Sequence, residues 1–404
     1  MSRPGLLDEA AAGLAAALAR GRVERDVPFS SLTTYGLGGP AAVLVRAQDE
    51  EDLAAVAGAL PAGVPFLCVG RGSNLLVADE GFAGVAVLLD GPLADLSITP
   101  DPGDGGRAAI LAGGGVKLPV LARQAAAAGW GGVEFFAGIP GSVGGAVRMN
   151  AGGHGRETVE VLRRAWVVDL GGGAAAGVEE RPVGSLDLTY RHSNLGPAHV
   201  VVRAEFTVAA RPADEAKAEI DEVVRWRRVN QPGGNNAGSV FTNPPGDSAG
   251  RLIDACGLKG FRVGTAWVSE RHANFFQADP DGRGRAADVV ALVLEVRRRV
   301  EAETGVRLVP ELRRVAFAGM AGARPGAPAA WPGDDHAAVA GAPPEVVRSS
   351  GTPVVPEERR ASGAEPAGPN LRSSGTPVVR QERRDLAGIA PAPVGSASAL
   401  GGIT

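Results

Sequence analysis

GWGGVEFFAGIPGSVGGAVRMNAGGHG, from Gly129 to Gly155, is the stretch around which the rest of the sequence is organised. Ten of its 27 residues are glycine, yet it also contains large apolar side chains such as Phe135, Phe136 and Ile139. A flexible linker lacks such apolar residues, whereas a packed loop that a ligand approaches closely needs both kinds. The alternative is a set of tight turns between short strands, so the rest of the chain has to decide.

Composition narrows the class of protein. The chain of 404 residues suggests two or three domains. Its net charge of −4 gives no general attraction to nucleic acid or to anionic membranes, and no apolar run is long enough to span a bilayer. Asp8 and Glu9 stand where an export signal has cations, so the N-terminus predicts an amphipathic helix.

Cysteine and histidine usage bears on compartment and metal binding. Cys68 and Cys256 match no metal-binding or CxxC spacing, which favours a reducing cytosol with each thiol in a core. The five histidines show no HxxxH spacing, which argues against a zinc hydrolase. We therefore expect a cytoplasmic protein without a metal site.

Periodicity predicts a mixed chain of helices and strands. The expected helices are 7–20, 49–60, 118–128, 213–228, 249–256 and 286–303, and the expected strands are 42–46, 64–70, 85–89, 91–112 (with a polar turn at its middle), 161–169, 199–209, 265–269 and 306–312. The charged helix 213–228 is predicted to begin a new domain.

The composition changes after Arg314. Residues 319–404 contain twelve prolines, thirteen glycines and a single aromatic residue, Trp331, which is a disordered composition. RSSGTPVV occurs at Arg348–Val355 and again at Arg372–Val379. Two copies are too few for a solenoid, so a neutral duplication is favoured over phosphorylation or docking sites at the Thr-Pro pairs. We expect deletion of 319–404 to leave activity intact.

A second glycine-rich loop follows a predicted strand. GRGSNLL, Gly70–Leu76, is neither a P-loop nor a GxGxxG fingerprint. Its glycines free backbone N–H groups and its Ser and Asn add short donors, which makes a nest for a pyrophosphate; the alternative is a turn with a local Asn cap. Together with Gly129–Gly155, which could add donors and a wall for a planar ring, it suggests FAD. The candidate cofactor-binding residues are Gly70, Arg71, Gly72, Ser73, Asn74, Leu75, Gly138, Ile139, Pro140, Gly144 and Gly145.

Three polar residues are candidates for the chemistry. Arg191, in YRHS at a strand end, could hold a carboxylate bidentately, although it could also be a surface arginine. Ser239, in NAGSVFTNP, has no GxSxG context, so it is a possible proton donor rather than an acyl-transfer nucleophile. Glu311 lies in the apolar alternation of VRLVPEL and could be a buried acid with a raised pKa, or a strand-edge glutamate paired with Arg313 or Arg314.

Taken together and in order, these segments closely resemble the bacterial UDP-N-acetylenolpyruvoylglucosamine reductases, the MurB family of peptidoglycan synthesis. The matching segments are Thr33–Ala41, Gly70–Gly84, Glu134–Gly152, Tyr190–Ser193, Asn236–Pro244, Ala249–Phe275 and Leu308–Arg313. Any one of them is weakly specific, but seven in family order are highly specific.

The resemblance implies an α+β fold. Residues 1–90 and 91–210 would form a two-part FAD-binding domain of the vanillyl-alcohol-oxidase (PCMH) type, residues 211–318 a smaller α+β domain for the UDP-sugar, and residues 319–404 the tail. NADPH would reduce the flavin, which would then reduce the enolpyruvyl group of UDP-N-acetylglucosamine enolpyruvate to give UDP-N-acetylmuramate. The implied partners are these small molecules, with no nucleic acid and no membrane insertion, and the implied enzyme is a monomer.

The resemblance also implies residue roles. Arg191 would polarise the substrate carboxylate with help from Glu311, and Ser239 would protonate the neighbouring carbon. Asn243, Lys259 and Arg313 match family contacts with the substrate. Family members of one branch carry a tyrosine-bearing insertion between the YR and serine motifs, but the 47 residues between Arg191 and Ser239 contain no tyrosine. The resemblance therefore places the chain in the branch without that loop, and the candidates to cover the uridine diphosphate are Arg227, Arg228 and Gln231.

Two other kinds of protein remain as alternatives. A sugar-lactone oxidase of the same fold often tethers FAD through a histidine in the nucleotide loop, and GRGSNLL has none. A catalytically silent flavin-binding protein would be expected to have lost at least one of Arg191, Ser239 and Glu311, and all three are present.

Overall fold

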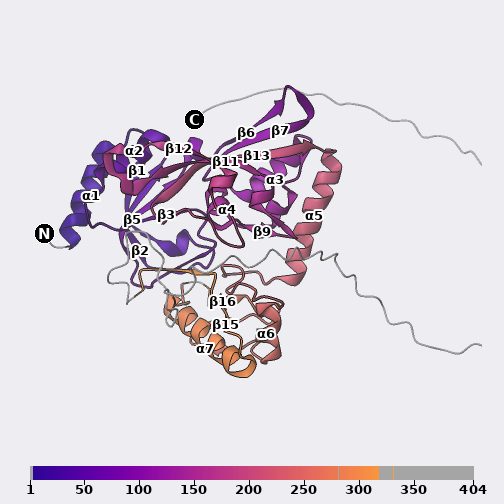
Figure 1. The fold of residues 1–404 in the computed structure, drawn as a ribbon. Coiled ribbons are helices and arrows are strands. Elements are labelled where there is room, and N and C mark those ends of the chain that lie inside the picture. Colours follow the sequence, from indigo (N-terminus) through magenta and orange to yellow (C-terminus); the bar gives the residue numbers. More distant parts are fainter. Residues whose placement is uncertain (1–2, 281, 318–330, 332–404) are drawn as a thin grey trace, which may run out of the picture. The chain divides into compact units, whose positions relative to one another are not determined.

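The structure, a computed structural model, describes residues 3–280, 282–317 and 331 (Figure 1). Within them, helices and strands build three α+β parts around three main hydrophobic cores. The helices are α1 (Arg3–Ala17), α2 (Glu50–Ala59), α3 (Leu118–Ala127), α4 (Val143–Met149), α5 (Ala213–Asn230), α6 (Ala249–Ala255) and α7 (Ala286–Thr304). Among the described residues, no helix is both long and apolar enough to cross a membrane.

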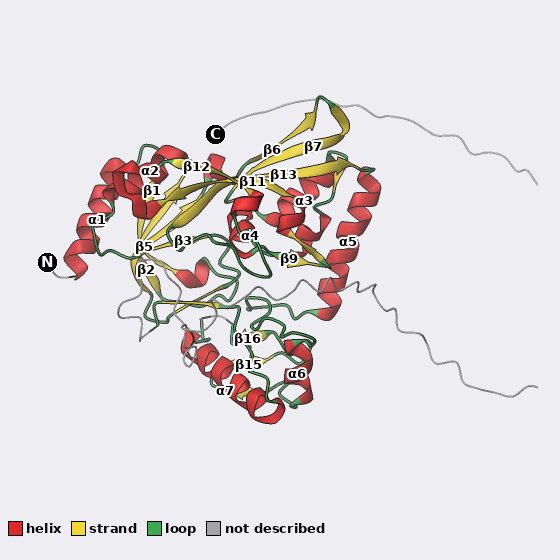
Figure 2. Ribbon diagram, in the orientation of Figure 1, coloured by secondary structure: helices red, strands yellow, loops and turns green. Residues whose placement is uncertain are grey.

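The first part is a four-stranded sheet in the order β1-β2-β5-β3, with α1 and α2 packed on it (Figure 2). Its strands are β1 (Arg22–Pro28), β2 (Pro40–Ala47), β3 (Phe66–Val69) and β5 (Phe82–Leu89). β2, β5 and β3 are parallel and only β1 runs antiparallel. As predicted, Asp49 caps α2, because its Oδ1 accepts the N–H of Asp52 at 2.9 Å.

The second part is an antiparallel sheet in the order β12-β11-β13-β7-β6, with β8 also paired to β13. Its strands are β6 (Leu96–Asp101), β7 (Asp104–Gly113), β8 (Trp130–Gly131), β11 (Leu162–Asp169), β12 (Val178–Pro182) and β13 (His199–Ala210). β6 and β7 form the hairpin that the polar turn within 91–112 predicted. Helices α3 and α4 share its core, where the rings of Phe136 and Phe206 meet edge to face.

Helix α5 belongs to this second core, which corrects the predicted domain boundary at residue 211. Its buried side chains Ala216, Ile220 and Val223 pack with α3 and the 3-10 helix η3 (Glu134–Gly138). This apolar stripe is narrow in a highly charged helix, so the sequence alone did not indicate which core it joins. The third part therefore begins after Asn230.

The third part packs α6 and α7 against a small sheet in the order β14-β15-β16. Its strands are β14 (Arg262–Val263), β15 (Ala266–Val268) and β16 (Phe276–Ala278). The predicted apolar face of α7, which includes Val289, Val296 and Val300, is fully buried. Gly305 ends α7 in a left-handed conformation at φ +71°, where glycine is favoured.

The chain then returns to the first part. Strand β17 (Arg313–Val315) pairs in parallel with β4 (Leu75–Val77), the strand that follows the GRGSN loop. The sequence predicted the last strand at 306–312; that segment instead forms no regular strand and has one isolated bridge, between Phe241 and Pro310. Proline lacks the N–H that a regular ladder requires, so pairing starts only beyond it.

The stretch Gly129–Gly155 contains more helix than predicted. It was expected to be a loop, but α4 occupies its centre, followed by the short strands β9 (Gly152–Gly153) and β10 (Arg156–Glu157). Ser142 caps α4 by accepting the N–H of Gly145 at 3.4 Å. Two consecutive glycines disfavour a helix, so tertiary packing rather than local propensity decides this element. The remaining 3-10 helices are η1 (Phe29–Ser31), η2 (Gly91–Ala94), η4 (Thr158–Glu160), η5 (Leu170–Ala175) and η6 (Val183–Ser185).

The predicted disordered tail, 319–404, lies outside the described residues except at Trp331. That residue is only 5% exposed and packs in the core of the third part. The packing of Trp331 therefore differs from the disorder that the composition of 319–404 predicted. The RSSGTPVV repeats also lie outside the described residues.

Candidate active site

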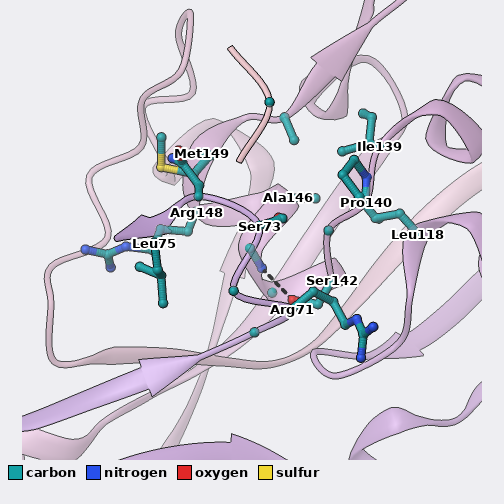
Figure 3. Close-up of a pocket in the computed structure, with 18 of the residues that line it drawn as sticks. Arg71, Ser73, Leu75, Leu118, Ile139, Pro140, Ser142, Ala146, Arg148 and Met149 are labelled. Carbon is teal, nitrogen blue, oxygen red and sulfur yellow. Dashed lines mark hydrogen bonds between the residues drawn. The ribbon is translucent and has the colours of Figure 1, made fainter. Parts of the chain in front are cut away.

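A single cavity of about 610 Å³ collects most of the residues predicted from the sequence. This volume falls within the usual range for ligand sites. Figure 3 shows side chains of the first glycine loop, such as Arg71 and Ser73, around the same space as Ile139, Pro140 and Ser142 of the second. The predicted cofactor-binding residues that line it are Gly70, Arg71, Gly72, Ser73, Asn74, Leu75, Gly138, Ile139, Pro140, Gly144 and Gly145.

The first glycine loop presents free backbone donors to the cavity. The N–H groups of residues 71–74 make no hydrogen bond to any residue that the structure describes. Gly72 lies at φ +60°, and a Cβ there would lie 2.2 Å from the carbonyl oxygen of Leu32, so only glycine fits. Successive unpaired N–H groups form an anion-binding concavity. The loop therefore has the chemistry to bind a pyrophosphate.

The two glycine loops touch each other. A Cβ on Gly70 would lie 2.4 Å from Ser142 Oγ, so a glycine is needed for this approach. The N–H groups of Gly141 and Ser142 also have no hydrogen-bond partner among the described residues. Both loops can thus direct backbone donors at one ligand, and this cradle fits a dinucleotide such as FAD.

The sequence suggested that the second glycine loop offers backbone donors to the ligand. Gly144 and Gly145, however, do not provide such donors. The N–H of Gly144 donates to Gly114 O at 2.8 Å, and that of Gly145 donates to Ser142 Oγ. A Cβ on Gly144 would lie 3.2 Å from the same Gly114 oxygen. These two glycines therefore serve the close packing of α4 against the sheet, where they form part of the cavity wall.

Arg191 stands at the corner of a tight turn in which Thr189 and His192 exchange backbone hydrogen bonds. Its φ of +55° is rare for a residue with a side chain, and such strain is typical of functional sites. The guanidinium donates from Nη2 to Gly152 O at 3.2 Å and lies 4.8 Å from the centre of the Tyr190 ring. Its Nη1 is buried and donates no hydrogen bond within the described structure. The site thus holds an oriented cation with an unused donor.

Asn150 supports this turn and was missed by the sequence analysis. It is fully buried, and its Nδ2 donates to Thr189 O at 3.0 Å and to Glu157 Oε2 at 2.9 Å. Its φ of +39° closes helix α4, a position that favours glycine or asparagine. An asparagine inside the glycine-rich stretch, just before Gly152 and Gly153, was the available signal.

Glu311 pairs with Arg191 rather than with Arg313 or Arg314. Arg191 Nε lies 3.1 Å from Glu311 Oε1. Burial raises the pKa of Glu311, as the apolar alternation around it predicted, and the charge of Arg191 opposes that rise. Burial and the nearby Arg148 lower the pKa of Arg313 to about 10.

Ser239 lines the same cavity from a rigid segment. Asn274 holds the next two residues: its O accepts the N–H of Val240 at 2.9 Å, its Oδ1 accepts that of Phe241 at 2.9 Å, and its Nδ2 donates to Phe241 O at 2.8 Å. The N–H of Glu311 in turn donates to Val240 O at 2.8 Å. A ladder of main-chain bonds therefore links Ser239 to Glu311.

The predicted substrate residues divide into two groups. Asn243, Arg227 and Arg313 line the cavity. Lys259 lies outside the cavity lining and donates to Asp254 Oδ2 at 2.7 Å. Of the two further candidates to cover the uridine diphosphate, Gln231 lines the cavity and accepts from Arg227 Nε at 2.7 Å, whereas Arg228 is exposed and does not line it.

Several cavity residues were not identified from the sequence, namely Arg46, Cys68, Lys117, Arg148 and His199. Cys68 packs against the core of the first part, as expected, and also lines the cavity, where burial raises its pKa to about 11. His199 Nδ1 accepts the N–H of Gly196 at 2.7 Å, and burial lowers its pKa. The sequence offered one indication that Lys117 could be functional, because it is one of only three lysines in the chain.

Together, the fold and the cavity define a flavoprotein with a two-part FAD-binding domain and a smaller α+β domain that closes the site. Residues 40–175 match the family model of an FAD binding domain, and residues 229–315 match that of the UDP-N-acetylenolpyruvoylglucosamine reductase C-terminal domain. The second match starts near the end of α5, in agreement with the corrected boundary. FAD is thus confirmed as the cofactor.

Proteins named UDP-N-acetylenolpyruvoylglucosamine reductase are similar over most of the chain. The one from Acidiphilium cryptum is 44% identical over 299 residues, which are 73% of this chain and 92% of the relative. The one from Rhodopseudomonas palustris strain HaA2 is 40% identical over 321 residues, which are 78% of this chain and 100% of the relative. The crystal structure of MurB from Thermus caldophilus is 38% identical, with a TM-score of 0.60 over 73% of this chain and 99% of that one. This chain belongs to the UDP-N-acetylenolpyruvoylglucosamine reductase family.

Proposed function

We propose that the protein reduces the enolpyruvyl group of UDP-N-acetylglucosamine enolpyruvate to the lactyl group of UDP-N-acetylmuramate, with NADPH as reductant, in peptidoglycan synthesis. The observation that carries the proposal is that Arg191, Ser239 and Glu311 line the cavity formed by the two glycine loops. Overall, NADPH and one proton are consumed, the double bond gains two hydrogens, and NADP⁺ is released. The two glycine loops would hold FAD, which would supply the hydride-transfer chemistry between NADPH and the terminal carbon of the double bond.

Arg191 and Glu311 have the geometry to stabilise the charge that this addition creates. Hydride addition sends an electron pair towards the substrate carboxylate, which becomes enolate-like. Arg191 has a buried Nη1 without a hydrogen-bond partner in the described structure, so it can donate to that carboxylate without breaking another hydrogen bond. Preorganised donors of this kind are worth several kcal/mol at a developing charge, roughly 3–4 by analogy with oxyanion holes. Glu311, with its raised pKa, holds the guanidinium in place through Nε.

Ser239 is the proposed proton donor to the carbon that bears the carboxylate. A serine hydroxyl is a weak acid in water, but next to a carbanion-like centre and cations it needs only a transient, matched transfer. The proton returns to Ser239 from solvent. Its rigid segment favours this role because a proton donor must lie within hydrogen-bond reach of the reacting carbon.

The UDP-sugar contacts are the finer part of the proposal. Asn243, Arg227 and Arg313 are the proposed contacts, and Gln231 braces Arg227 at the cavity edge. Asn243 Oδ1 accepts the N–H of Ala249 at 3.1 Å, which leaves its amide nitrogen for a ligand. Lys259 is left out because it pairs with Asp254 outside the cavity lining.

We further propose that the enzyme works as a monomer in the cytoplasm. Its two cysteines, Cys68 and Cys256, are free, which suits a reducing compartment. All the residues with a proposed role lie in the same chain. Sedimentation of the purified protein with and without FAD would test the monomer.

The function is tested by identifying the products. The purified protein is incubated with NADPH and the enolpyruvyl UDP-sugar, and the nucleotide products are separated and weighed by mass spectrometry. The proposal predicts one UDP-sugar that has gained two hydrogens for each NADPH oxidised. NADPH oxidation with oxygen consumption and an unchanged UDP-sugar would instead indicate an oxidase.

A further inference from the structure

Residues 311–315 present two opposite faces. Glu311, Arg313 and Val315 line the cavity. The side chains between them, Leu312 and Arg314, are buried on the other side, where Leu312 belongs to the core of the third part. This is the alternation of an extended chain, in which neighbouring side chains point to opposite faces. The placement of the two cavity-facing charges therefore depends on what holds the opposite face.

Hydrogen bonds to its main chain fix the edges of this segment. The N–H of Arg313 donates to Asn74 O at 3.0 Å, and Asn74 Nδ2 donates to Glu311 O at 3.2 Å. These bonds join the segment to the first glycine loop, and the bond from the Glu311 N–H to Val240 O joins it to the serine segment. Strand β17 itself has only three residues, so its pairing with β4 is short.

Trp331 packs on the opposite face. It is 5% exposed, and its Nε1 donates to Leu312 O at 3.0 Å in a buried hydrogen bond. The guanidinium of Arg314 lies 5.0 Å from the ring centre of Trp331 and 5.0 Å from that of Phe317. Trp331 lies beyond the matched C-terminal domain, which ends at 315. It thus contacts both Leu312 and Arg314, the two residues on the face opposite the cavity.

We propose that Trp331 is a positioning residue, which holds residues 311–315 in register so that Glu311 stays paired with Arg191. Since side chains alternate, a slip of one residue would move Glu311 and Arg313 out of the cavity. A smaller shift would lengthen the Arg191–Glu311 contact, and misplacement by about 1 Å can cost about 100-fold in rate. The inference rests on the proposed function, and it revises the expectation that residues 319–404 can be deleted without loss.

The test compares full-length holoenzymes by rapid mixing. Trp331→Ala should bind FAD in full and be reduced by NADPH within about twofold of wild type, yet reduce the enolpyruvyl substrate about 10- to 100-fold more slowly. Trp331→Phe keeps the ring but loses the N–H donor, so it should recover most of this loss. The matched control is Trp166→Ala, which removes a tryptophan packed against Arg164 and Arg203 outside the cavity lining.

A second readout does not depend on turnover. Binding of the enolpyruvyl substrate to oxidised enzyme can be measured by equilibrium dialysis, and the dissociation constant should rise in Trp331→Ala but not in Trp166→Ala. Equal slowing of both half-reactions, loss of FAD from Trp331→Ala, or wild-type rates in that variant would each overturn the positioning role. A wild-type enzyme that fails to reduce the substrate would instead refute the proposed function, so the two failures are distinguishable.

Discussion

Arg191 and Glu311 come from different parts of the fold, yet Nε of the first lies 3.1 Å from Oε1 of the second. The arginine stands on a strained turn beside the second glycine loop, and the glutamate on the segment that returns from the third part to the first glycine loop. The pair therefore forms only when the FAD-binding domain and the third part are both folded. Four predictions follow from this arrangement and from the cavity around it.

Arg191→Lys should slow substrate reduction about 10- to 100-fold, and Arg191→Ala about 100- to 1000-fold. Lysine keeps the charge but cannot bind Glu311 and the substrate carboxylate with a planar fork. Reduction of FAD by NADPH should stay close to the wild-type rate in both variants. Arg163→Ala, which removes an arginine with a side chain 64% exposed, is the control. Equal slowing of both half-reactions in Arg191→Ala would argue against a specific role for Arg191 at the carboxylate.

Glu311→Gln should change stability in a pH-dependent way. Because burial raises the pKa of Glu311 above 4.5, the folded protein holds this proton more tightly than the unfolded chain. Stability is therefore lost as pH rises from the unfolded pKa through the folded pKa, and the loss is complete above the latter. The amide does not titrate, so the variant should melt higher than wild type at about pH 7, and the gain should vanish below about pH 4.

Thermal melts across this pH range measure the effect. Glu301→Gln, an exposed position on α7, should show no such trend. A Glu311→Gln variant that is less stable than wild type at neutral pH would mean that the ion pair with Arg191 outweighs the burial of the carboxylate.

Gly72→Ala should purify with little FAD. Its φ of +60° and the 2.2 Å approach of Leu32 O leave no room for a Cβ, so the loop that offers free N–H groups must distort. Gly63→Ala is the matched control, since it also has a positive φ, +84°, but no atom lies within 4 Å of the added Cβ. The ratio of flavin to protein absorbance gives the result. Full flavin content in Gly72→Ala would remove this loop from the cofactor site.

Ser239→Ala should be reduced by NADPH at the wild-type rate and lose most of the substrate-reducing half-reaction, by about 100-fold or more. Ser239→Cys, which retains a donor, should recover part of the loss. Ser185→Ala, which removes a hydroxyl that donates to Pro182 O, serves as the control. Single-turnover kinetics of the pre-reduced enzymes separate the two steps. Normal turnover of Ser239→Ala would exclude the proton-donor role.

Much of this site could be predicted because its chemistry is encoded locally. The glycine loops and Asp49 are recognisable from residue type and spacing, and Glu311 stood out as a carboxylate in an apolar alternation. The residues alone left open a pairing of Glu311 with Arg313 or Arg314, which are near in sequence, whereas Arg191 is near Glu311 only in space. Long-range pairs of this kind leave no local pattern.

Packing decided the features that the sequence missed. Helix α4 forms despite two glycines because it lies against the sheet at Gly114, and α5 joins the second core through a narrow stripe of buried residues. Lys259 matched a family motif but pairs with Asp254 outside the cavity lining. Trp331, in a segment of disordered composition, packs against Leu312. For α4, α5 and Trp331, contacts between distant segments outweigh the local pattern.

The central claim is that this site transfers reducing equivalents from NADPH to an enolpyruvyl UDP-sugar through bound FAD. The most direct measurement follows the flavin absorbance of purified enzyme without oxygen. NADPH should bleach it, and the colour should return when the enolpyruvyl UDP-sugar is added, in a one-to-one ratio. Recovery with oxygen alone, and none with the enolpyruvyl UDP-sugar, would contradict the account.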